Sequence, residues 1–539
     1  MRPGIGAKLA LVAIAIAVGL AAVAVAPGRT PAPGRATVLW LAVESLATDG
    51  DLEPADDAAA FRERFGTEAR GAAAGRDGKL PVPPATRPWV RAAATVRTVA
   101  GWPGVFASQW LLWLASALLL VRAVRPKLGS SSATAWVAVV VSASAAPLAA
   151  LHLVPEAFAL LGIALAAACI WGRRSAPTAE PEQVYQGDLA ERSGAWRWPV
   201  AGLGFGLAAA AAPSLLPLAA PFVVAAPRGT RLLRGAAFLV GAALSFAAAA
   251  LVAGWPWPPL ELWYDPRLLG WSALGALAGR HLGIVPLFAP LLLAFSEPAR
   301  DEGRRWIPWA AAAALLAQVV TSPFDLAGES GAPGNPWALP VVALLALLPA
   351  TGPSRGLLAL AAILGLALVA PLVLDSLGVG DRRWARPARV VRAWLPLETT
   401  QRALPGEAVL DRGSGVVLRG FEPEVFSGKD GRLRVTAART PLWIESATEL
   451  GSLRLELGDG APATIEVRGG AAGEVLFRPS GEVAVDVGLD SPSRRHPTWR
   501  SPRGAAFYTV ELILPRAPAA PLPVDLSIAR PAGPAMETE

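Results

Sequence analysis

Leu9-Ala-Leu-Val-Ala-Ile-Ala-Ile-Ala-Val-Gly-Leu-Ala-Ala-Val-Ala-Val25 is an uninterrupted apolar run near the N-terminus, and Arg2 and Lys8 precede it. Such a run is typical of either a signal peptide or a retained membrane helix. Further apolar stretches downstream favour the retained helix. Of the 539 residues, 53% are hydrophobic and 17% charged, and the mean hydropathy is +0.43. The sequence therefore predicts an integral membrane protein.

Apolar stretches near the length of about 20 residues that crosses a bilayer recur along the chain. One stretch, Val200–Ala226, is interrupted by prolines and has arginines beyond both ends, which predicts a hairpin of two segments. Together with this hairpin, the remaining stretches predict about eleven spans: Ala7–Val25, Pro103–Val121, Ala133–Leu151, Val154–Trp171, Gly235–Ala253, Gly283–Phe295, Trp306–Val320, Trp337–Pro349 and Gly356–Val373.

Basic residues in short loops set the predicted orientation. The loop with Arg122, Arg125 and Lys127 falls in the cytoplasm if the N-terminus is cytoplasmic. This predicts a multi-pass protein of the bacterial inner (plasma) membrane, with a transmembrane domain over residues 1–380 and an outer loop over residues 27–102. Within that loop, Pro54 followed by two aspartates predicts the start of a juxtamembrane helix. Phe61 and Phe65 would share one face of this helix, which could lie on the membrane surface.

The period of the apolar pattern changes in the C-terminal part of the sequence. Segments such as Ser452-Leu-Arg-Leu-Glu-Leu-Gly458 and Glu482-Val-Ala-Val-Asp-Val-Gly488 alternate apolar and polar residues, with turns at intervals of about ten residues. This pattern predicts an extracytoplasmic all-β sandwich over residues 381–530, of jelly-roll or immunoglobulin-like type. Residues 531–539 are predicted to be a disordered end.

Charge and cysteine content exclude several classes of function. The net charge is +7 and the isoelectric point about 10.2, but the arginines lie mostly beside apolar runs, which argues against nucleic-acid binding. Cys169 is the only cysteine and the chain has three histidines, so neither a disulfide nor a zinc site is expected.

An acidic run, Glu44-Ser-Leu-Ala-Thr-Asp-Gly-Asp-Leu-Glu-Pro-Ala-Asp-Asp57, follows the first apolar span. Within it, Asp49 and Asp51 flank Gly50, and a turn there would bring two carboxylates together near the membrane. Such a pair could act as a general base toward an acceptor hydroxyl, or hold a divalent cation against a phosphate. The alternative is a solvated acidic loop. A divalent cation is the one cofactor that the sequence leaves open.

Three further elements carry candidate substrate-binding residues. Arg280 and His281, within Gly279-Arg-His-Leu-Gly-Ile-Val-Pro286, could bind a phosphate or anchor the chain at the membrane interface. Glu156 begins a helix after a tight turn and is either a simple helix cap or a functional carboxylate. Asn335 ends a glycine-rich loop that could fold over a sugar or be a flexible turn.

These pieces in series resemble the bacterial GT-C glycosyltransferases, polytopic enzymes that take sugars from polyprenyl-phosphate donors. The resemblance rests on Thr48-Asp-Gly-Asp-Leu52, Pro155-Glu156, the Gly279–Pro286 element, Gly334-Asn335 and Leu395-Pro-Leu-Glu398. It implies that Asp49 or Asp51 activates the acceptor, while Arg280 and His281 neutralise the departing phosphate. Gly334-Asn-Pro-Trp337 departs from the family's pattern, which leaves open a divergent or inactive member.

The leading hypothesis is therefore a membrane glycosyltransferase that moves a sugar from a polyprenyl-phosphate donor to an envelope glycan or lipid acceptor on the outer face. Two alternatives stay open. The chain could be a transporter or flippase of lipid-linked sugars, which should show inverted repeats and broken helices. It could also be a non-catalytic envelope scaffold whose β-domain binds protein.

Overall fold

The computed structural model describes residues 5–28, 35–66, 80, 82, 86–172, 194–254, 266–279, 283–298, 301–322 and 334–376, and in the C-terminal part 408–411, 416–420, 433–435, 437–446, 450–457, 466–469, 474–477, 484–488, 494–498, 501–520 and 522–529. The chain divides into two compact units, Met1–Pro396 and Leu397–Glu539. The predicted disordered end at residues 531–539 lies outside the described residues, as do Arg280 and His281.

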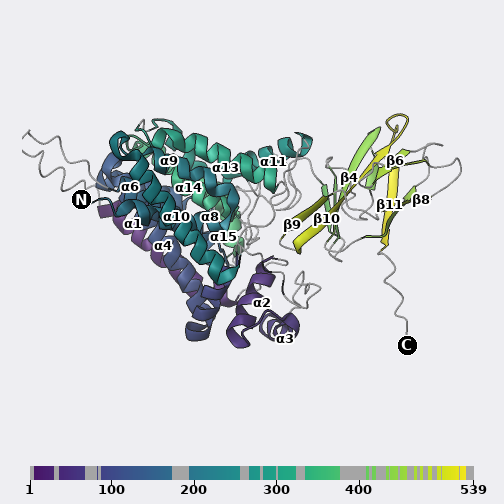
Figure 1. Ribbon diagram of the computed structural model, residues 1–539, viewed down its shortest axis with the longest axis horizontal. Helices are drawn as coiled ribbons and strands as arrows, with labels where there is room; N and C mark the ends of the chain where they lie inside the picture. The colour runs from purple at the N-terminus through teal and green to yellow at the C-terminus, as the bar shows by residue number, and fades with distance from the viewer. Residues whose placement is uncertain are drawn as a thin grey trace, which may run out of the picture. The chain divides into compact units, whose positions relative to one another are not determined.

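The first unit is helical (Figure 1). Its α-helices and 3₁₀ helices (η), in chain order, are α1 (Ile5–Ala24), η1 (Ala26–Gly28), α2 (Arg35–Thr48), α3 (Pro54–Phe65), α4 (Arg87–Ser142), α5 (Leu148–Leu151), α6 (Ala157–Trp171), α8 (Arg197–Ala211), η4 (Pro213–Ala219), α9 (Ala220–Val224), η5 (Arg228–Thr230), α10 (Arg231–Ala253), α11 (Pro266–Ala278), α12 (Ile284–Leu287), η6 (Ala289–Phe295), η7 (Arg304–Trp306), α13 (Ile307–Thr321), η8 (Pro336–Ala338), α14 (Leu339–Leu345) and α15 (Arg355–Ser376).

The prediction of about eleven membrane spans, and with it the GT-C-like polytopic fold, is wrong. Among the described residues, two helices are long and apolar enough to cross a membrane, Arg87–Ser142 and Arg228–Val252. The sequence predicts separate spans at Pro103–Val121 and Ala133–Leu151, but all of the first and most of the second belong to α4. That element is interrupted at Gly101 and Gly129, whose backbone angles are not helical.

Several other predicted spans form helices too short to cross a bilayer. Helix α6 has 15 residues, α14 has seven and α12 has four, against the 20 or so that a span needs. Prolines contribute to this, because Pro286, Pro290 and Pro336 lie at or near the places where one short helix ends and the next begins.

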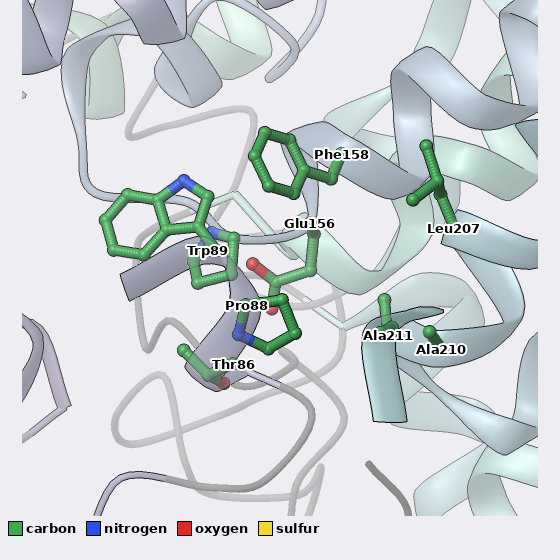
Figure 2. A pocket seen from close by; sticks show the side chains of 10 residues that line it. Thr86, Pro88, Trp89, Glu156, Phe158, Leu207, Ala210 and Ala211 are labelled. Carbon is green, nitrogen blue, oxygen red and sulfur yellow. The ribbon is translucent and has the colours of Figure 1, made fainter. Parts of the chain in front are cut away.

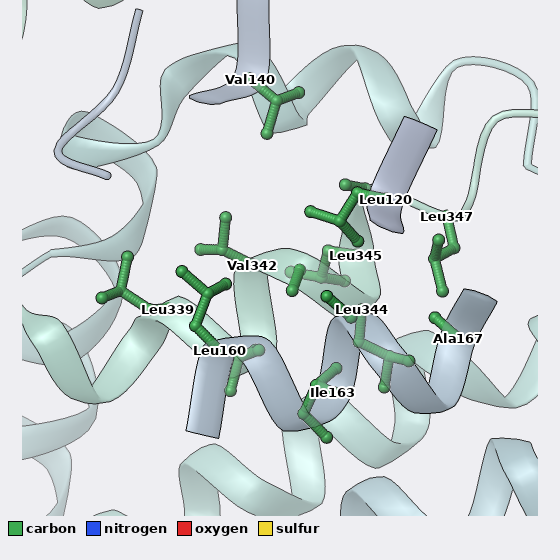
Figure 3. Packing of buried hydrophobic residues seen from close by; sticks show 14 of the residues in the cluster. Leu120, Val140, Leu160, Ile163, Ala167, Leu339, Val342, Leu344, Leu345 and Leu347 are labelled. Carbon is green, nitrogen blue, oxygen red and sulfur yellow. The ribbon is translucent and has the colours of Figure 1, made fainter. Parts of the chain in front are cut away.

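Other stretches are apolar because the protein itself buries them. Leu160, Ile163 and Ala167 on α6 pack against α14, where Leu339–Leu345 is buried throughout (Figure 3). Leu120 and Val140 of α4 join the same cluster. A buried core helix and a membrane span have the same composition, so hydropathy alone overcounts spans.

Glycines allow very close helix packing around α8. Gly202 and Gly206 face α10, where a methyl group on Gly202 would overlap the Phe238 carbonyl oxygen and one on Gly206 would overlap that of Ala242. On the other side, Gly204 lies against Gly162 of α6, and neither has room for a side chain. The spacing Gly202-x-x-x-Gly206 is typical of helix pairs in membranes.

The outer surface of the helical unit carries many exposed apolar side chains. On α10, Leu232 is 91% exposed and Leu251 is 88% exposed. Comparable side chains on other helices are Ile16 and Leu20 of α1, Trp309 and Leu316 of α13, and Leu360 and Ile363 of α15. Apolar surface spread over several helices exceeds what a monomer in water normally exposes.

The second unit consists of two antiparallel sheets (Figure 1). Its strands are β1 (Ala408–Asp411), β2 (Val416–Gly420), β3 (Leu433–Val435), β4 (Arg439–Ser446), β5 (Ser452–Leu457), β6 (Glu466–Gly469), β7 (Glu474–Phe477), β8 (Ala484–Gly488), β9 (Arg494–Thr498), β10 (Ser501–Ile513) and β11 (Leu522–Ala529).

One sheet has the order β1-β2-β4-β10-β6-β7, with β9 also paired to β10, and the other has the order β3-β11-β5-β8. Leu442 and Tyr508 from the first sheet share one buried cluster with Leu455 and Val524 from the second. Two sheets enclosing one core form a sandwich. The Tyr508 hydroxyl accepts a hydrogen bond of 3.0 Å from the backbone N–H of Leu450.

Candidate functional site

The acidic turn at Asp49-Gly50-Asp51 is built by the last turn of α2. The N–H groups of Asp49 and Gly50 both donate to the Ser45 carbonyl oxygen, at 2.9 and 3.0 Å. Gly50 has φ of 78°, the left-handed conformation that ends a helix and favours glycine. The local sequence is thus sufficient to stop α2 and reverse the chain here.

The two aspartates have different environments. Asp51 Oδ1 accepts hydrogen bonds from the Ser45 hydroxyl, at 3.0 Å, and from the Glu53 backbone N–H, at 2.9 Å. Asp49 is exposed, and its Oδ2 accepts a hydrogen bond of 2.8 Å from the neighbouring Thr48 hydroxyl. Asp51 therefore holds the turn together, while Asp49 presents its carboxylate to the surroundings.

Glu44 anchors α2, and with it the acidic turn, to α4. Its carboxylate receives two hydrogen bonds from the Arg97 guanidinium, at 2.7 and 2.8 Å, and one from the Trp102 indole N–H, at 2.9 Å. Trp102 also stacks on Trp40, with ring centroids 5.0 Å apart. Sequence reasoning missed this ion pair because 53 residues separate its partners.

Helix α3 begins at Pro54, where the sequence predicts a helix, but its aromatic face is covered by protein. Phe61 and Phe65 each pack edge-on against Trp40, with centroids 5.2 and 5.4 Å away. Phe61 is 1% exposed. This face therefore docks α3 on α2, and the position of α3 at a membrane surface stays a prediction.

Glu156 lines a small pocket where several helices begin or end (Figure 2). Its carboxylate lies near the rings of Trp89 and Pro88, with Leu207 across from them. The pocket has a cavity volume of about 40 Å³, room for roughly three water molecules. Its remaining lining residues are Thr86, Pro155, Phe158, Ala210, Ala211 and Ala249.

Two of the residues that line this mostly apolar pocket have polar side chains. Glu156 is 7% exposed and Thr86 is 1% exposed. Among the described residues, Thr86 Oγ1 has no hydrogen-bond partner. A buried hydroxyl of this kind is costly unless it is paired, so the pocket suits a ligand group that both donates and accepts hydrogen bonds. A sugar hydroxyl has that chemistry.

The acidic turn and the Glu156 pocket contact different parts of α4. The pocket contacts Trp89, whereas Glu44 binds Arg97, eight residues further along the helix. At 1.5 Å per residue this separation is about 12 Å. Of the four predicted site residues that the structure describes, Asp49 and Asp51 therefore lie in one place and Glu156 in another.

Asn335 is buried, at 1% exposed, and it lies directly before η8 with φ of 52°. The preceding Gly334 sits tightly against Ala145 and Leu148, where a methyl group would come within 2.9 and 2.7 Å of their side chains. Asn335 thus forms a tight turn that packs inside the helical unit. Whether it binds substrate stays a prediction, as does the role of Arg280 and His281.

A buried set of hydrogen bonds joins Trp337, Ser214 and Gln318, which are far apart in the sequence. The Trp337 indole N–H donates to the Ser214 hydroxyl at 3.0 Å, and that hydroxyl donates to Gln318 Oε1 at 2.7 Å. Ser214 follows α8 closely, and α8 supplies Ala210 and Ala211 to the pocket. These hydrogen bonds therefore connect η4, η8 and α13 close to the end of α8.

The described residues include no group of three histidine, cysteine, aspartate or glutamate side chains that could hold a metal ion. A cation at the acidic turn would have Asp49 and Asp51 as its carboxylate ligands. Comparisons of the chain with protein-family models, with curated proteins and with solved structures give no match.

Proposed function

We propose that this protein is a plasma-membrane glycosyltransferase that moves a sugar from a polyprenyl-phosphate donor to an envelope glycan or lipid acceptor on the outer face. Membrane residence is supported by the exposed leucines of α10 and by the apolar side chains on α1, α13 and α15. In water these surfaces would be costly, whereas lipid chains can cover them. The glycine-mediated contacts of α8 with α6 and α10 support the same setting.

Helix α4 carries basic residues at two places, Arg87, Arg91 and Arg97 near its start and Arg122, Arg125 and Lys127 beyond its middle, so the two places differ in their carboxylates. Near the start lies the carboxylate end, defined by Glu44, Asp49, Asp51 and Glu156. Beyond the middle of α4 lies the basic end, defined by the contacts of Lys127 and Arg304 with Asp301. Residues 102–128 connect the two ends as an uninterrupted helix that is about 40 Å long at 1.5 Å per residue, enough to cross a bilayer.

Among the described residues, arginines and lysines are more numerous at the basic end, where those of η5, α10 and η7 join those of α4. The positive-inside rule therefore favours the cytoplasm for the basic end and the outer face for the carboxylate end. This segregation is the observation that carries the proposal, because an exposed carboxylate at the outer surface can meet the headgroup of a lipid-borne sugar. The N-terminus would be cytoplasmic, and the second unit would be extracytoplasmic.

In the proposed reaction Asp49 is the general base. An acceptor hydroxyl attacks the anomeric carbon, the bond from that carbon to the phosphate oxygen breaks, and the hydroxyl proton passes to Asp49. Polyprenyl phosphate leaves with the bonding electrons. We assign this role to Asp49 because Asp51 already accepts two hydrogen bonds within the turn. The Glu156 pocket lies apart from Asp49, so it would hold a hydroxyl of an extended acceptor and not of the transferred sugar.

The test is transfer from labelled polyprenyl-phosphate sugars by the purified full-length protein, with a membrane extract as the acceptor source. We expect Asp49→Asn to lower the rate by at least about 100-fold and Asp51→Asn to lower it less. Glu53→Gln is the matched control, since Glu53 is exposed beside the turn and makes no side-chain cap to α3. Equal transfer by wild type and Asp49→Asn would overturn the assignment, and binding without transfer would favour a transporter.

A further inference from the structure

The basic end of the helical unit carries far more positive than negative charge in the part of the chain that the structure describes. It combines Arg122, Arg125 and Lys127 of α4 with η7, with Arg228 of η5, and with Arg231 and Arg234 at the start of α10. Two carboxylates lie among them. Glu302 pairs with Arg228 at 2.8 Å and with Arg231 at 2.5 Å, and Asp301 contacts Lys127 at 3.5 Å and Arg304 at 3.6 Å.

Two contacts show that these segments meet at one place. The buried Arg304 guanidinium donates a hydrogen bond of 3.2 Å to the Ala123 carbonyl oxygen of α4. Gly303 packs so tightly against Ala225 that a methyl group would come within 2.6 Å of its side chain. The start of α10, η7 and the middle of α4 therefore form a single basic surface.

Exposed apolar side chains lie directly beside these charges. Leu232 and Leu233, between Arg231 and Arg234, are 91% and 75% exposed. Trp306, next to Arg305, is 42% exposed. A surface that binds a soluble polyanion would leave these leucines in water. A bilayer surface accommodates both the apolar side chains and the charges, because the leucines enter the acyl region, tryptophan prefers the interface, and arginines reach the phosphates.

We propose that the basic end is a docking surface for the headgroups of anionic phospholipids in the cytoplasmic leaflet. Arg228 makes the first contact, since its side chain is 82% exposed. Glu302 competes with the headgroup phosphate for Arg228 and Arg231, so it limits the affinity. This inference shares membrane residence with the proposed function but does not depend on sugar transfer.

The test uses the full-length protein in neutral detergent, with fluorescent phosphatidylglycerol and phosphatidylcholine as probes of equal chain length. We expect at least tenfold tighter binding of phosphatidylglycerol. Arg228→Gln should weaken the binding of phosphatidylglycerol about fivefold, because each basic residue near an anionic surface contributes about 1 kcal/mol. The double variant Arg228→Gln with Arg234→Gln should weaken it about 25-fold. Glu302→Gln should strengthen the binding of phosphatidylglycerol.

Arg454→Gln is the matched control, because Arg454 is a half-exposed, ion-paired arginine of the β unit. It should bind both lipids like the wild type. Each variant is first checked for the elution volume and tryptophan emission of the wild type, so that a misfolded protein is not scored.

Three results would overturn the inference: equal affinity for the two lipids, an equal loss with Arg454→Gln, or displacement of phosphatidylglycerol by inorganic phosphate at similar concentration, which would indicate a site for small anions. Lipid selectivity in a protein without transferase activity would refute only the proposed function. Transfer by a protein without lipid selectivity would refute only the docking surface.

Discussion

Removing the charge of Glu44 tests whether one ion pair holds the acidic turn in position. Glu44→Gln keeps the size of the side chain and an acceptor for the Trp102 N–H. It leaves Arg97 without its carboxylate partner, at a site where the Glu44 and Arg97 side chains are 10% and 26% exposed. Because α3 docks on α2 through Trp40, the loss should loosen both helices.

The cost of breaking the Glu44–Arg97 ion pair follows from how far its two side chains are buried. Breaking a fully buried ion pair by removing one partner costs about 3–5 kcal/mol, and an exposed pair contributes about 0–1 kcal/mol. Since Arg97 is about a quarter exposed, we expect about 2 kcal/mol. This corresponds to a roughly 30-fold rise in the local opening constant, at 1.36 kcal/mol per factor of ten.

Hydrogen exchange of the α2 amides measures this opening directly. A double-mutant cycle with Glu44→Gln and Arg97→Gln should give a coupling energy of about 2 kcal/mol. The same cycle on the exposed pair Arg454 and Glu456, whose side chains are 51% and 53% exposed, should give less than about 0.5 kcal/mol. Equal coupling in the two cycles, or exchange in Glu44→Gln at the wild-type rate, would refute the reasoning.

Two further predictions concern packing and a buried hydrogen bond. Gly202→Ala should destabilise the helical unit by about 1–3 kcal/mol, because its methyl group overlaps the Phe238 carbonyl, and the loss should appear as a lower melting temperature in detergent. The control is Gly270→Ala on α11, whose methyl group meets open space and whose stability should stay within about 1 kcal/mol of wild type. Equal losses in the two variants would contradict the packing argument. Tyr508→Phe should speed exchange of the Leu450 amide by roughly 5- to 150-fold, since its N–H loses a buried acceptor worth about 1–3 kcal/mol; an unchanged rate would show that water replaces the hydroxyl.

Local patterns in the sequence located several elements well. Helix α3 begins at Pro54, because proline and acidic residues favour the first turn of a helix. Strands β5 and β8 lie within the segments where apolar and polar residues alternate. In each case the signal comes from neighbouring residues, and the tertiary structure agrees with it.

The sequence could not show what covers an apolar helix or which distant residues meet. Helix α6 is as apolar as a membrane span, yet it is buried by α4, α8 and α14 and has only 15 residues. Glu44 lay inside the acidic run that drew attention to Asp49 and Asp51, but its partner Arg97 is remote in sequence. Gly202-x-x-x-Gly206 is a signal of close helix packing that the sequence does contain.

The account rests on the two ends of the helical unit lying on opposite sides of a membrane. Cys169 is the only cysteine, so a Cys169→Ser background permits single-cysteine labelling with a membrane-impermeant maleimide. Glu53→Cys at the carboxylate end should be labelled in intact spheroplasts, and Arg228→Cys at the basic end only after the membrane is permeabilised. Labelling of both positions in intact spheroplasts, or the reverse order, would contradict the account.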